Sequence, residues 1–301
     1  MILCCGEALI DMLPRETATG EGAFAPYAGG SVYNTAIALG RLNVPVQFFS
    51  GLSSDLFGDI LRGQLASSHV DSSPAAVSDR PTTLAFVTLT DGHASYAFYD
   101  ENTAGRMLFE NDLPKTDADA LFFGGISLVV EPCGAAYEAL MLREASDRLT
   151  MIDPNIRPSF ITDEPAYRKR LTRMMAAADI IKTSDEDLEW MTGSTDADAL
   201  LEQTGAQVVL LTRGSAGVRI VTLSGAFDVP AEKAKVVDTV GAGDTFSAGF
   251  MAQLHKSGHL TKERLRDATE ADMRAAAAFG ARVAAITVSR AGANPPWASE
   301  L

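Results

Sequence analysis

The sequence has few cysteines, no long apolar run and no basic leader, and each absence excludes a class of protein. Among its 301 residues are three cysteines, Cys4, Cys5 and Cys133, an odd number without metal-ligand spacing. This usage favours reduced thiols in the cytoplasm. No run reaches the roughly 18 apolar residues of a membrane span, and the apolar start breaks at Gly6 and Glu7 without preceding basic residues, unlike a signal peptide. We therefore expect a cytoplasmic protein that does not bind membranes.

Positive charge is also scarce. Lys and Arg number 25 against 39 Asp and Glu, which gives a formal net charge of −14. Proteins that bind nucleic acids or anionic membrane surfaces rely on cationic side chains, so we expect neither partner. A small anionic ligand is still compatible with this charge, because a helix N-terminus and a metal ion can offset the negative field locally.

The composition is that of a folded protein with a sizeable core. Hydrophobic residues make up 47% of the chain and charged residues 21%, which is ordinary for a globular protein. The length is compatible with two domains of about 150 residues or with one large α/β unit. No internal repeat or low-complexity linker divides the chain.

Short apolar runs alternate with helical patterns. Periodicity predicts helices at 31–42, 58–65, 135–145, 167–178 and 185–191 and an Ala-rich helical region near the end. Strands are predicted at 1–13, 46–52, 82–90, 94–99, 121–126, 149–153, 179–184 and 208–212, with a hairpin-like segment at 218–230. Continuous apolar strands between helices are typical of a parallel sheet covered on both faces, and Asp91-Gly92 is typical of a hairpin turn. We predict an α/β protein with a central sheet and a small hairpin-bearing appendage.

The segment 238–254, DTVGAGDTFSAGFMAQL, is the most informative one. Gly241, Ala242 and Gly243 directly precede a helical pattern, and small residues allow consecutive backbone N–H groups to face one point. The partial positive charge of the helix start makes such a turn a pocket for a transferring phosphate. Asp244 is a candidate for chemistry there, although aspartate is also a common helix cap.

A second glycine segment, residues 29–42, begins with Gly29 and Gly30 and carries Asn34 one turn inside a predicted helix. Glycines allow the close approach of a ligand, and asparagine offers both a donor and an acceptor to sugar hydroxyls. Alone, this signal is weak, because paired glycines before a helix are common.

Together the two segments resemble the ribokinase-like sugar kinases, also called the phosphofructokinase-B family. The resemblance extends almost from end to end and includes 6–14 (GEALIDMLP), 153–160 (DPNIRPSF), 182–193 (KTSDEDLEWMTG), 211–218 (LTRGSAGV) and the TVSRAGA segment near the C-terminus. It implies a three-layer α/β/α fold with a mainly parallel central sheet, one domain over residues 1–301. It also implies a small β-sheet lid from segments at approximately 12–28 and 82–108, which often pairs with the lid of a second subunit in a homodimer.

In this family the aspartate of the GAGD motif is the catalytic base, which here is Asp244. A carboxylate can orient a sugar hydroxyl and accept its proton as the oxygen attacks the γ-phosphoryl group of ATP. The backbone N–H groups of Gly241, Ala242 and Gly243 would then stabilise the charge on that group.

The resemblance also implies a set of sugar-binding residues: Asp11, Gly29, Gly30, Asn34, Phe98, Asn155, Arg157 and Asp244. For some of these, ordinary structural roles are open. Asp11 is also typical of a strand-end turn, Arg157 of a surface salt bridge, and Phe98, like Tyr96, of a packed core.

For the nucleotide, the matching residues are Lys182, Thr212, Arg213, Gly214, Gly217, Gly241 and Gly243. Mg²⁺ is expected at Asp187, through water, but here the chain departs from the family. Many members carry Asn-x-x-Glu where this chain has Ser184-Asp185-Glu186-Asp187. Because Mg²⁺ keeps several waters and needs few protein ligands, the substitution is compatible with function. The alternative is a solvated helix start with Ser184 as its cap.

Three further residues, Asp238, Thr239 and Ser289, match positions that bind K⁺ in several family members. We therefore hold activation by a monovalent cation as a hypothesis.

The segments FYDENTAGRML and GEALIDMLP look most like those of bacterial fructokinases. The second reading is a 2-keto-3-deoxygluconate kinase, in which Arg157 would pair with the substrate carboxylate. A third reading is a catalytically silent sugar-binding protein on the same fold, against which the intact GAGD motif argues.

Overall fold

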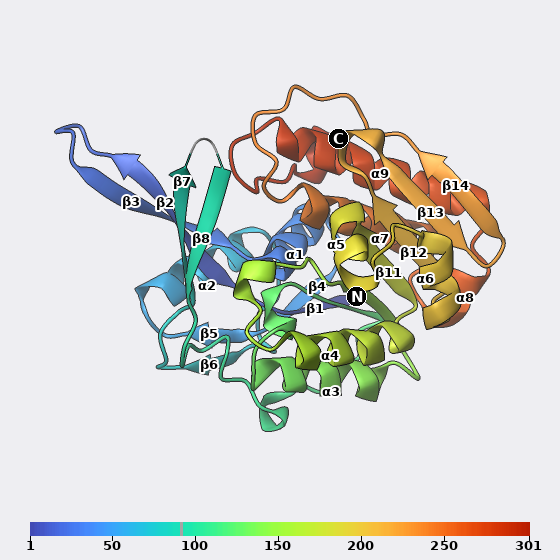
Figure 1. Cartoon of the computed structure of the whole chain (residues 1–301), viewed down its shortest axis with the longest axis horizontal. Coiled ribbons are helices and arrows are strands. Elements are labelled where there is room, and N and C mark those ends of the chain that lie inside the picture. The colour runs from blue at the N-terminus through green and yellow to red at the C-terminus, as the bar shows by residue number, and fades with distance from the viewer. Residues whose placement is uncertain (91–92) are drawn as a thin grey trace.

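A computed structural model describes residues 1–90 and 93–301 of the chain, and in this part the largest sheet has eight strands. Their order is β14-β13-β12-β11-β10-β9-β1-β4, and every pair from β12 to β4 is parallel (Figure 1). The bounds are β1 Ile2–Cys5, β4 Val46–Phe49, β9 Ala120–Gly124, β10 Leu149–Asp153, β11 Ile180–Ser184, β12 Val208–Thr212, β13 Val218–Thr222 and β14 Gly225–Val229. The mainly parallel central sheet is therefore confirmed, and only β13 and β14 run antiparallel at one edge.

Helices cover both faces of this sheet. One face packs against α1 (Ser31–Arg41), α2 (Leu56–Ser67), α7 (Ala242–Ser257), α8 (Lys262–Arg266) and α9 (Glu270–Val288), and the other against α3 (Cys133–Glu144), α4 (Glu164–Ala177), α5 (Asp185–Thr192) and α6 (Ala197–Thr204). Figure 1 shows α9 above the strands and α3 and α4 below them. Along β1, Cys4 belongs to the first core and Cys5 to the second, because neighbouring strand residues point to opposite faces.

The N-terminal apolar stretch forms two strands, so the single strand predicted at 1–13 is wrong. β1 ends at Cys5, and β2 (Leu9–Glu16) begins in a different sheet. The reason lies at Gly6, where a Cβ atom would lie 2.4 Å from Cγ2 of Val32. Helix α1 thus packs directly against the chain at the point where it leaves the main sheet. The prediction also missed α6, whose Ala197–Thr204 segment is too short for a clear helical period.

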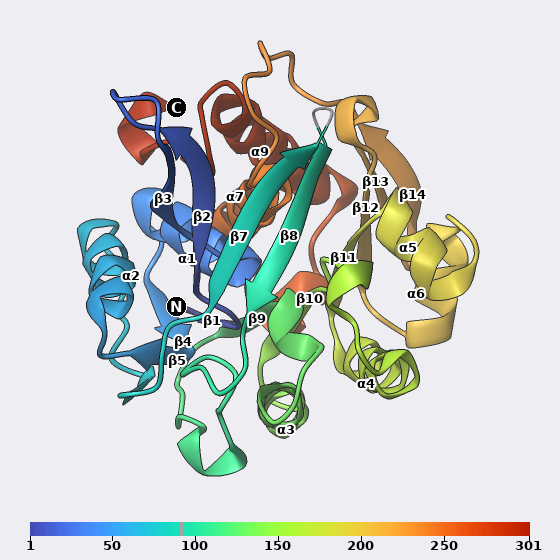
Figure 2. The same cartoon turned by 60° about the vertical axis from the view of Figure 1, so that its left-hand side comes forward.

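A separate four-stranded sheet has the order β3-β2-β7-β8, with bounds Gly22–Gly29 for β3, Leu84–Thr90 for β7 and His93–Tyr99 for β8. Figure 1 shows it projecting from one side of the main body, and in Figure 2 this side is turned toward the viewer. Its strands come from the two segments that resemble the family lid. The turn predicted at Asp91-Gly92 lies outside the described residues. Two short strands, β5 (Gly51–Ser53) and β6 (Ala76–Ser78), pair with each other near its base.

No helix in the described part of the chain is long and apolar enough to cross a membrane.

Candidate active site

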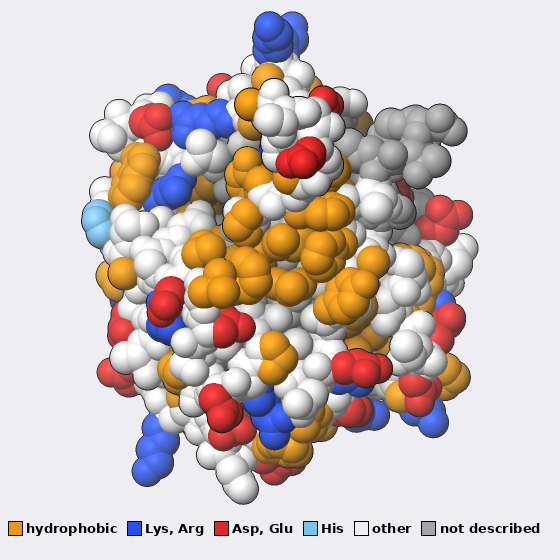
Figure 3. Space-filling view, turned by 90° about the vertical axis from the view of Figure 1, so that its left-hand side faces the viewer, with side chains coloured by type: hydrophobic (Ala, Val, Ile, Leu, Met, Phe, Trp, Pro, Cys, Tyr) orange, Lys and Arg blue, Asp and Glu red, His pale blue; other side chains and the backbone are white. Residues whose placement is uncertain are grey.

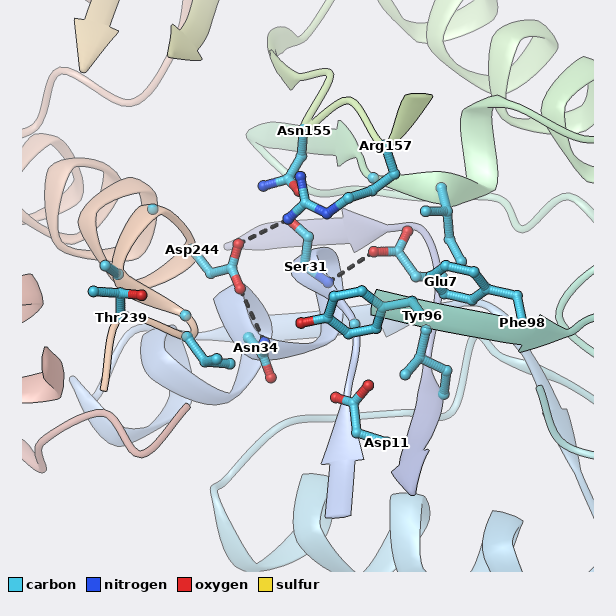
Figure 4. Close-up of a pocket in the computed structure, with 18 residues that line it drawn as sticks. Glu7, Asp11, Ser31, Asn34, Tyr96, Phe98, Asn155, Arg157, Thr239 and Asp244 are labelled. Carbon is cyan, nitrogen blue, oxygen red and sulfur yellow. Dashed lines mark hydrogen bonds between the residues drawn. The ribbon is translucent and has the colours of Figure 1, made fainter. Parts of the chain in front are cut away.

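A cavity of about 320 Å³ lies between the small sheet and the carboxyl ends of the parallel strands (Figure 4). Ligands of open α/β sheets bind at this edge, because loops and helix starts converge there. Most residues that the resemblance assigned to the sugar line the cavity. These are Asp11, Gly30, Asn34, Phe98, Asn155, Arg157 and Asp244, together with Thr239, Gly241, Ala242 and Gly243.

Asp244 is the third residue of α7, and its side chain points into the cavity. Its carboxylate accepts hydrogen bonds from Oγ of Ser31 at 2.8 Å and from Nδ2 of Asn34 at 2.9 Å. The N-cap of α7 is Gly241, which makes no side-chain capping bond, so Asp244 does not cap the helix. Burial raises the pKa of Asp244, and the hydrogen bonds from Asn34 and Ser31 act against this shift. The start of α1 therefore holds this carboxylate in place.

Gly29 and Gly30 have different roles. Gly30 lines the cavity and takes φ +112°, a conformation that glycine adopts without strain. Gly29 is buried and lies outside the lining, and a Cβ atom there would lie 2.3 Å from Oδ2 of Asp11. Gly29 thus leaves room for the Asp11 carboxylate. Burial, followed by the charge of Asp244, raises the pKa of Asp11 to about 6.

The small sheet contributes Tyr96 and Phe98 to the cavity through β8. Phe98 also packs edge-on against Phe160, with ring centroids 4.7 Å apart, and stacks on Tyr96 at 6.0 Å. The two alternatives for Phe98, cavity lining and packing, therefore coexist. Asn155, in the loop after β10, has φ +45°, which asparagine tolerates better than most residues.

The start of α7 also borders a second cavity of about 750 Å³. Four of the residues expected beside the nucleotide line it: Thr212, Gly214, Gly217 and Gly243. Gly241 lines the smaller cavity only, and Ala242, Gly243 and Thr239 belong to both cavities. Its other walls include apolar side chains that the sequence reading missed: Val236, Phe246, Ala281, Ala284, Ala285 and Val288. The Ala-rich pattern of α9 was the available signal, because small side chains make room for a flat ligand.

Arg213, also expected at the nucleotide, is not part of this lining. Its guanidinium donates to Oδ1 of Asp228 at 2.6 Å, so Arg213, directly after β12, forms an ion pair with a residue of β14. Arg157 makes no ion pair within the described residues and donates to the carbonyl oxygen of Ile156. The surface salt bridge considered for Arg157 is therefore absent there, and its side chain faces the cavity (Figure 4).

Lys182 lies beneath the start of α7. Its Nζ is 3.0 Å from the position that a Cβ atom of Gly243 would take, and it donates to Oδ2 of Asp153 at 2.7 Å. The two side chains are 4% and 0% exposed. Burial acts to lower the pKa of Lys182, but the charge and the hydrogen bond of Asp153, together with the charges of Asp187 and Asp244, outweigh burial and raise that pKa. A charged ammonium group is thus held next to the backbone that faces both cavities.

At the start of α5 the helix-cap alternative is confirmed, and the Mg²⁺ assignment of Asp187 stays a prediction. Oγ of Ser184 accepts the backbone N–H of Asp187 at 3.0 Å, so Ser184 is the helix cap. Asp187 is half-buried and accepts the N–H of Ile156 at 3.2 Å, whereas Glu186 is exposed. Burial raises the pKa of Asp187. Among the described residues no group of three or more His, Cys, Asp or Glu side chains is arranged to hold a metal ion.

The expected monovalent-cation residues lie near the end of α9. The carboxylate of Asp238 accepts backbone N–H groups from Gly292 at 2.9 Å and from Val240 at 3.0 Å. Ser289 donates to the carbonyl oxygen of Ile286 at 2.7 Å. The fold thus brings the loop that contains Asp238 next to the C-terminal segment that contains Gly292.

Sequence reasoning missed several residues of the smaller cavity: Glu7, Leu9, Ser31, Gly125 and Ile126. Ser31 follows directly after Gly29 and Gly30, and this adjacency to the glycine pair was the available signal. Glu7 interrupts the apolar N-terminal run, where an acidic residue is costly unless it has partners.

The chain is similar in sequence and in structure to known carbohydrate kinases. The family model for the pfkB family carbohydrate kinases matches residues 1–300. The chain is 53% identical to a fructokinase of Rhizobium leguminosarum bv. trifolii over 279 residues, or 91% of this chain and 86% of that protein. It is 32% identical to probable fructokinase-7 of Arabidopsis thaliana over 314 residues, or 99% and 90%. The crystal structure of a fructokinase with bound ATP from Xylella fastidiosa matches with a TM-score of 0.90 at 30% identity, covering 97% of this chain and 93% of that chain.

Proposed function

The chain belongs to the pfkB family of carbohydrate kinases, as its motifs predicted, and on this premise we propose that it transfers the γ-phosphoryl group of ATP to a hydroxyl group of fructose. The observation that carries the proposal is the position of the start of α7 between the two cavities. It borders both cavities and directs Asp244 into the smaller one. A sugar in the smaller cavity and a nucleotide in the larger one would meet at this point. The 53% identity to a fructokinase supports fructose as the acceptor.

Asp244 acts as the general base in this proposal. With two hydrogen bonds fixing its carboxylate, it can accept a hydrogen bond from the attacking sugar hydroxyl and then take the proton. Such orientation of the nucleophile is a large part of phosphoryl-transfer catalysis.

The backbone from Gly241 to Gly243 forms the anion hole. The first N–H groups of a helix have no partner within the helix, and the helix dipole adds partial positive charge at the same end. Lys182 lies directly beneath Gly243 and adds a full positive charge. Together they would stabilise the charge on the transferring phosphoryl group.

Asp187 fits the Mg²⁺ site that the family resemblance implies. It is a half-buried carboxylate with one oxygen bonded to the N–H of Ile156, and Mg²⁺ requires few direct protein ligands. When bound, Mg²⁺ would neutralise charge on the nucleotide phosphates.

The charges around the smaller cavity favour a neutral sugar. Three carboxyl groups line it, from Glu7, Asp11 and Asp244, and Arg157 is the one cationic residue among the described residues that line it. Hydroxyl groups can donate to the carboxylates, whereas a carboxylate substrate would meet repulsion. The unpaired state of Arg157 within the described residues supports the second candidate, a 2-keto-3-deoxygluconate kinase, in which it would bind the substrate carboxylate.

A panel assay separates these activities. ATP consumption would be measured with fructose, 2-keto-3-deoxygluconate, ribose and adenosine as acceptors. We expect the highest kcat/KM with fructose. A higher value with 2-keto-3-deoxygluconate would replace the proposed substrate, and sugar binding without turnover on any acceptor would indicate a silent sugar-binding protein.

The small sheet is proposed as a lid that closes over the sugar, excludes water and pairs with a second copy in a homodimer. Its outer face is rich in apolar side chains, which gather in the middle of the view in Figure 3. Phe24 and Tyr99 are 45% and 63% exposed and pack edge-on against Phe86. Exposed apolar patches of this kind are typical of interfaces. Tyr99→Lys should shift the sedimentation coefficient from that of a dimer to that of a monomer, and a monomeric unmodified chain would refute the proposal.

A monovalent cation is proposed beside the 238 loop, where Asp238, Thr239 and Ser289 supply oxygen atoms. K⁺ should raise kcat relative to a bulky organic cation, and equal rates in both would refute this site. The three cysteines are free and buried, which supports a location in the reducing cytoplasm.

A further inference from the structure

Glu7 is a buried carboxyl group in the sugar cavity that the proposed chemistry does not use. It lies between the end of β1 and the start of β2, where the chain leaves the main sheet and enters the small one. It is 8% exposed and lines the smaller cavity. Burying a carboxyl group is costly unless specific partners compensate, so its contacts indicate what it does.

The Glu7 carboxylate joins two segments that both line the cavity. Oε1 accepts the backbone N–H of Ser31, the first residue of α1, at 2.7 Å, and Oε2 accepts the N–H of Ser127 at 3.4 Å. The turn before Ser127 passes so close that a Cβ atom at Gly125 would lie 2.2 Å and 2.3 Å from the two carboxylate oxygens. Gly125 also has φ +69°. Because Gly125 has no side chain, the Glu7 carboxylate fits between this turn and α1.

The contact at Ser31 leads directly to the general base. The backbone N–H of Ser31 is bound by Glu7, and the hydroxyl of the same residue donates to Oδ1 of Asp244 at 2.8 Å. Figure 4 shows the two contacts as dashed lines, one from Ser31 to Glu7 and one from Ser31 to Asp244. We propose that Glu7 is a positioning residue of the phosphoryl-transfer site, whose ionised carboxylate fixes the first turn of α1 and thereby the Asp244 carboxylate.

The protonation of Glu7 gives this role a pH dependence. Burial is the main reason why the pKa of Glu7 is raised to about 7, and the charge of Asp244 adds to it, while the N–H groups of Ser31 and Ser127 oppose it. The other titratable groups around it are Asp11 on β2, Tyr137 on α3 and Tyr167 on α4. Burial raises the pKa of both tyrosines, so they stay neutral, and Arg157 is the charged group across the cavity. Loss of the Glu7 charge below pH 7 should weaken its hold on Ser31.

The test is the pH profile of kcat for Glu7→Gln, and it rests on the proposed sugar-kinase function. Initial rates of phosphoryl transfer to fructose would be measured from pH 5 to 9. We expect Glu7→Gln to lower kcat about tenfold with an unchanged KM for ATP, and to move the acid limb from near pH 7 to lower pH, because the titrating group is gone. A merely structural loss would lower kcat and leave the limb in place.

Two variants serve as controls. Asp179→Asn removes another buried carboxylate, which also accepts a backbone N–H, from Thr150 at 2.9 Å, but lies outside both cavities. It should keep the wild-type acid limb. Glu7→Asp keeps a titratable group with a shorter reach, and it should lower kcat while retaining a limb above that of Glu7→Gln. If Glu7→Gln does not fold, the kcat and the acid limb of Glu7→Asp provide the test.

The outcomes distinguish this inference from the proposed function. An unmoved acid limb in Glu7→Gln, or unchanged kcat in Glu7→Asp, would overturn the role of Glu7 alone if the unmodified chain phosphorylates fructose and Asp244→Asn does not. Absence of turnover by the unmodified chain on every sugar would overturn both.

Discussion

Replacing Lys182 by methionine would remove the ammonium group buried beneath the start of α7. The variant leaves Asp153 without its partner, and that side chain is 0% exposed. Breaking a buried ion pair by removing one partner typically costs about 3–5 kcal/mol, because the remaining charge stays desolvated. For a chain of this size this should appear as a fall in Tm on the order of 10 °C.

A matched double variant separates stability from catalysis. Lys182→Met with Asp153→Asn removes both charges while keeping both side chains similar in size, so most of the lost stability should return. The phosphoryl group would still lack the positive charge beside Gly243. In the unmodified chain, Nζ of Lys182 is 3.0 Å from the position that a Cβ atom of Gly243 would take. Loss of one preorganised electrostatic contact commonly lowers kcat about 100-fold.

The assay combines thermal unfolding with initial rates for the unmodified chain, the single variant and the double variant. A double variant with restored Tm and restored kcat would show that Lys182 acts only through stability. An unchanged Tm in Lys182→Met would instead refute the buried ion pair itself.

Three further predictions concern the carboxylates of the sugar cavity. Asp244→Asn should fold and bind ATP, as followed by calorimetry, yet lose at least about 100-fold in kcat, and near-normal turnover would overturn its role as general base. Asn34→Ala removes a hydrogen bond that lowers the pKa of Asp244. In the Glu7→Gln background, where Glu7 no longer sets the acid limb, that limb of the kcat profile should therefore move to higher pH; a limb that stays or moves lower would contradict this. Because the pKa of Glu7 rises from its ordinary 4.5 to about 7 on folding, the ionised carboxylate that orients Ser31 is costly to bury and protonation of Glu7 favours the folded chain. This contribution to the free energy of unfolding is fully present below pH 4.5 and is lost as the pH rises through 7. Urea unfolding at pH 5 and pH 8 should therefore differ more for the unmodified chain than for Glu7→Gln, by on the order of 3 kcal/mol, and equal differences would contradict the shift.

The sequence reading located the start of α7 and the start of α1 well. Gly241, Gly243 and Asp244 are close in the chain, and helix signals and glycine turns act over a few residues. Local patterns of this kind also predicted the parallel strands, because each is a continuous apolar run between helices.

Contacts between distant segments could not be predicted in this way. The hydrogen bond from Asn34 to Asp244 joins residues 210 positions apart. Arg213 forms an ion pair with Asp228, which lies on a neighbouring hairpin. The close packing of Val32 from α1 against Gly6, directly after the end of β1, is likewise a contact between distant segments. None of these partners is visible in a short window of sequence.

By itself, the sequence determined the fold class, the family and the short segments that carry its chemistry, because periodicity, glycine turns and motif spacing are properties of neighbouring residues. The tertiary structure alone decided that Ser31 and Asn34 hold Asp244, that Lys182 lies under Gly243, and that Glu7 binds the start of α1. These contacts arise where α1, α7 and the parallel strands end at one edge of the sheet. The low dielectric of this buried site strengthens the hydrogen bonds and ion pairs. Only the packed fold creates that burial.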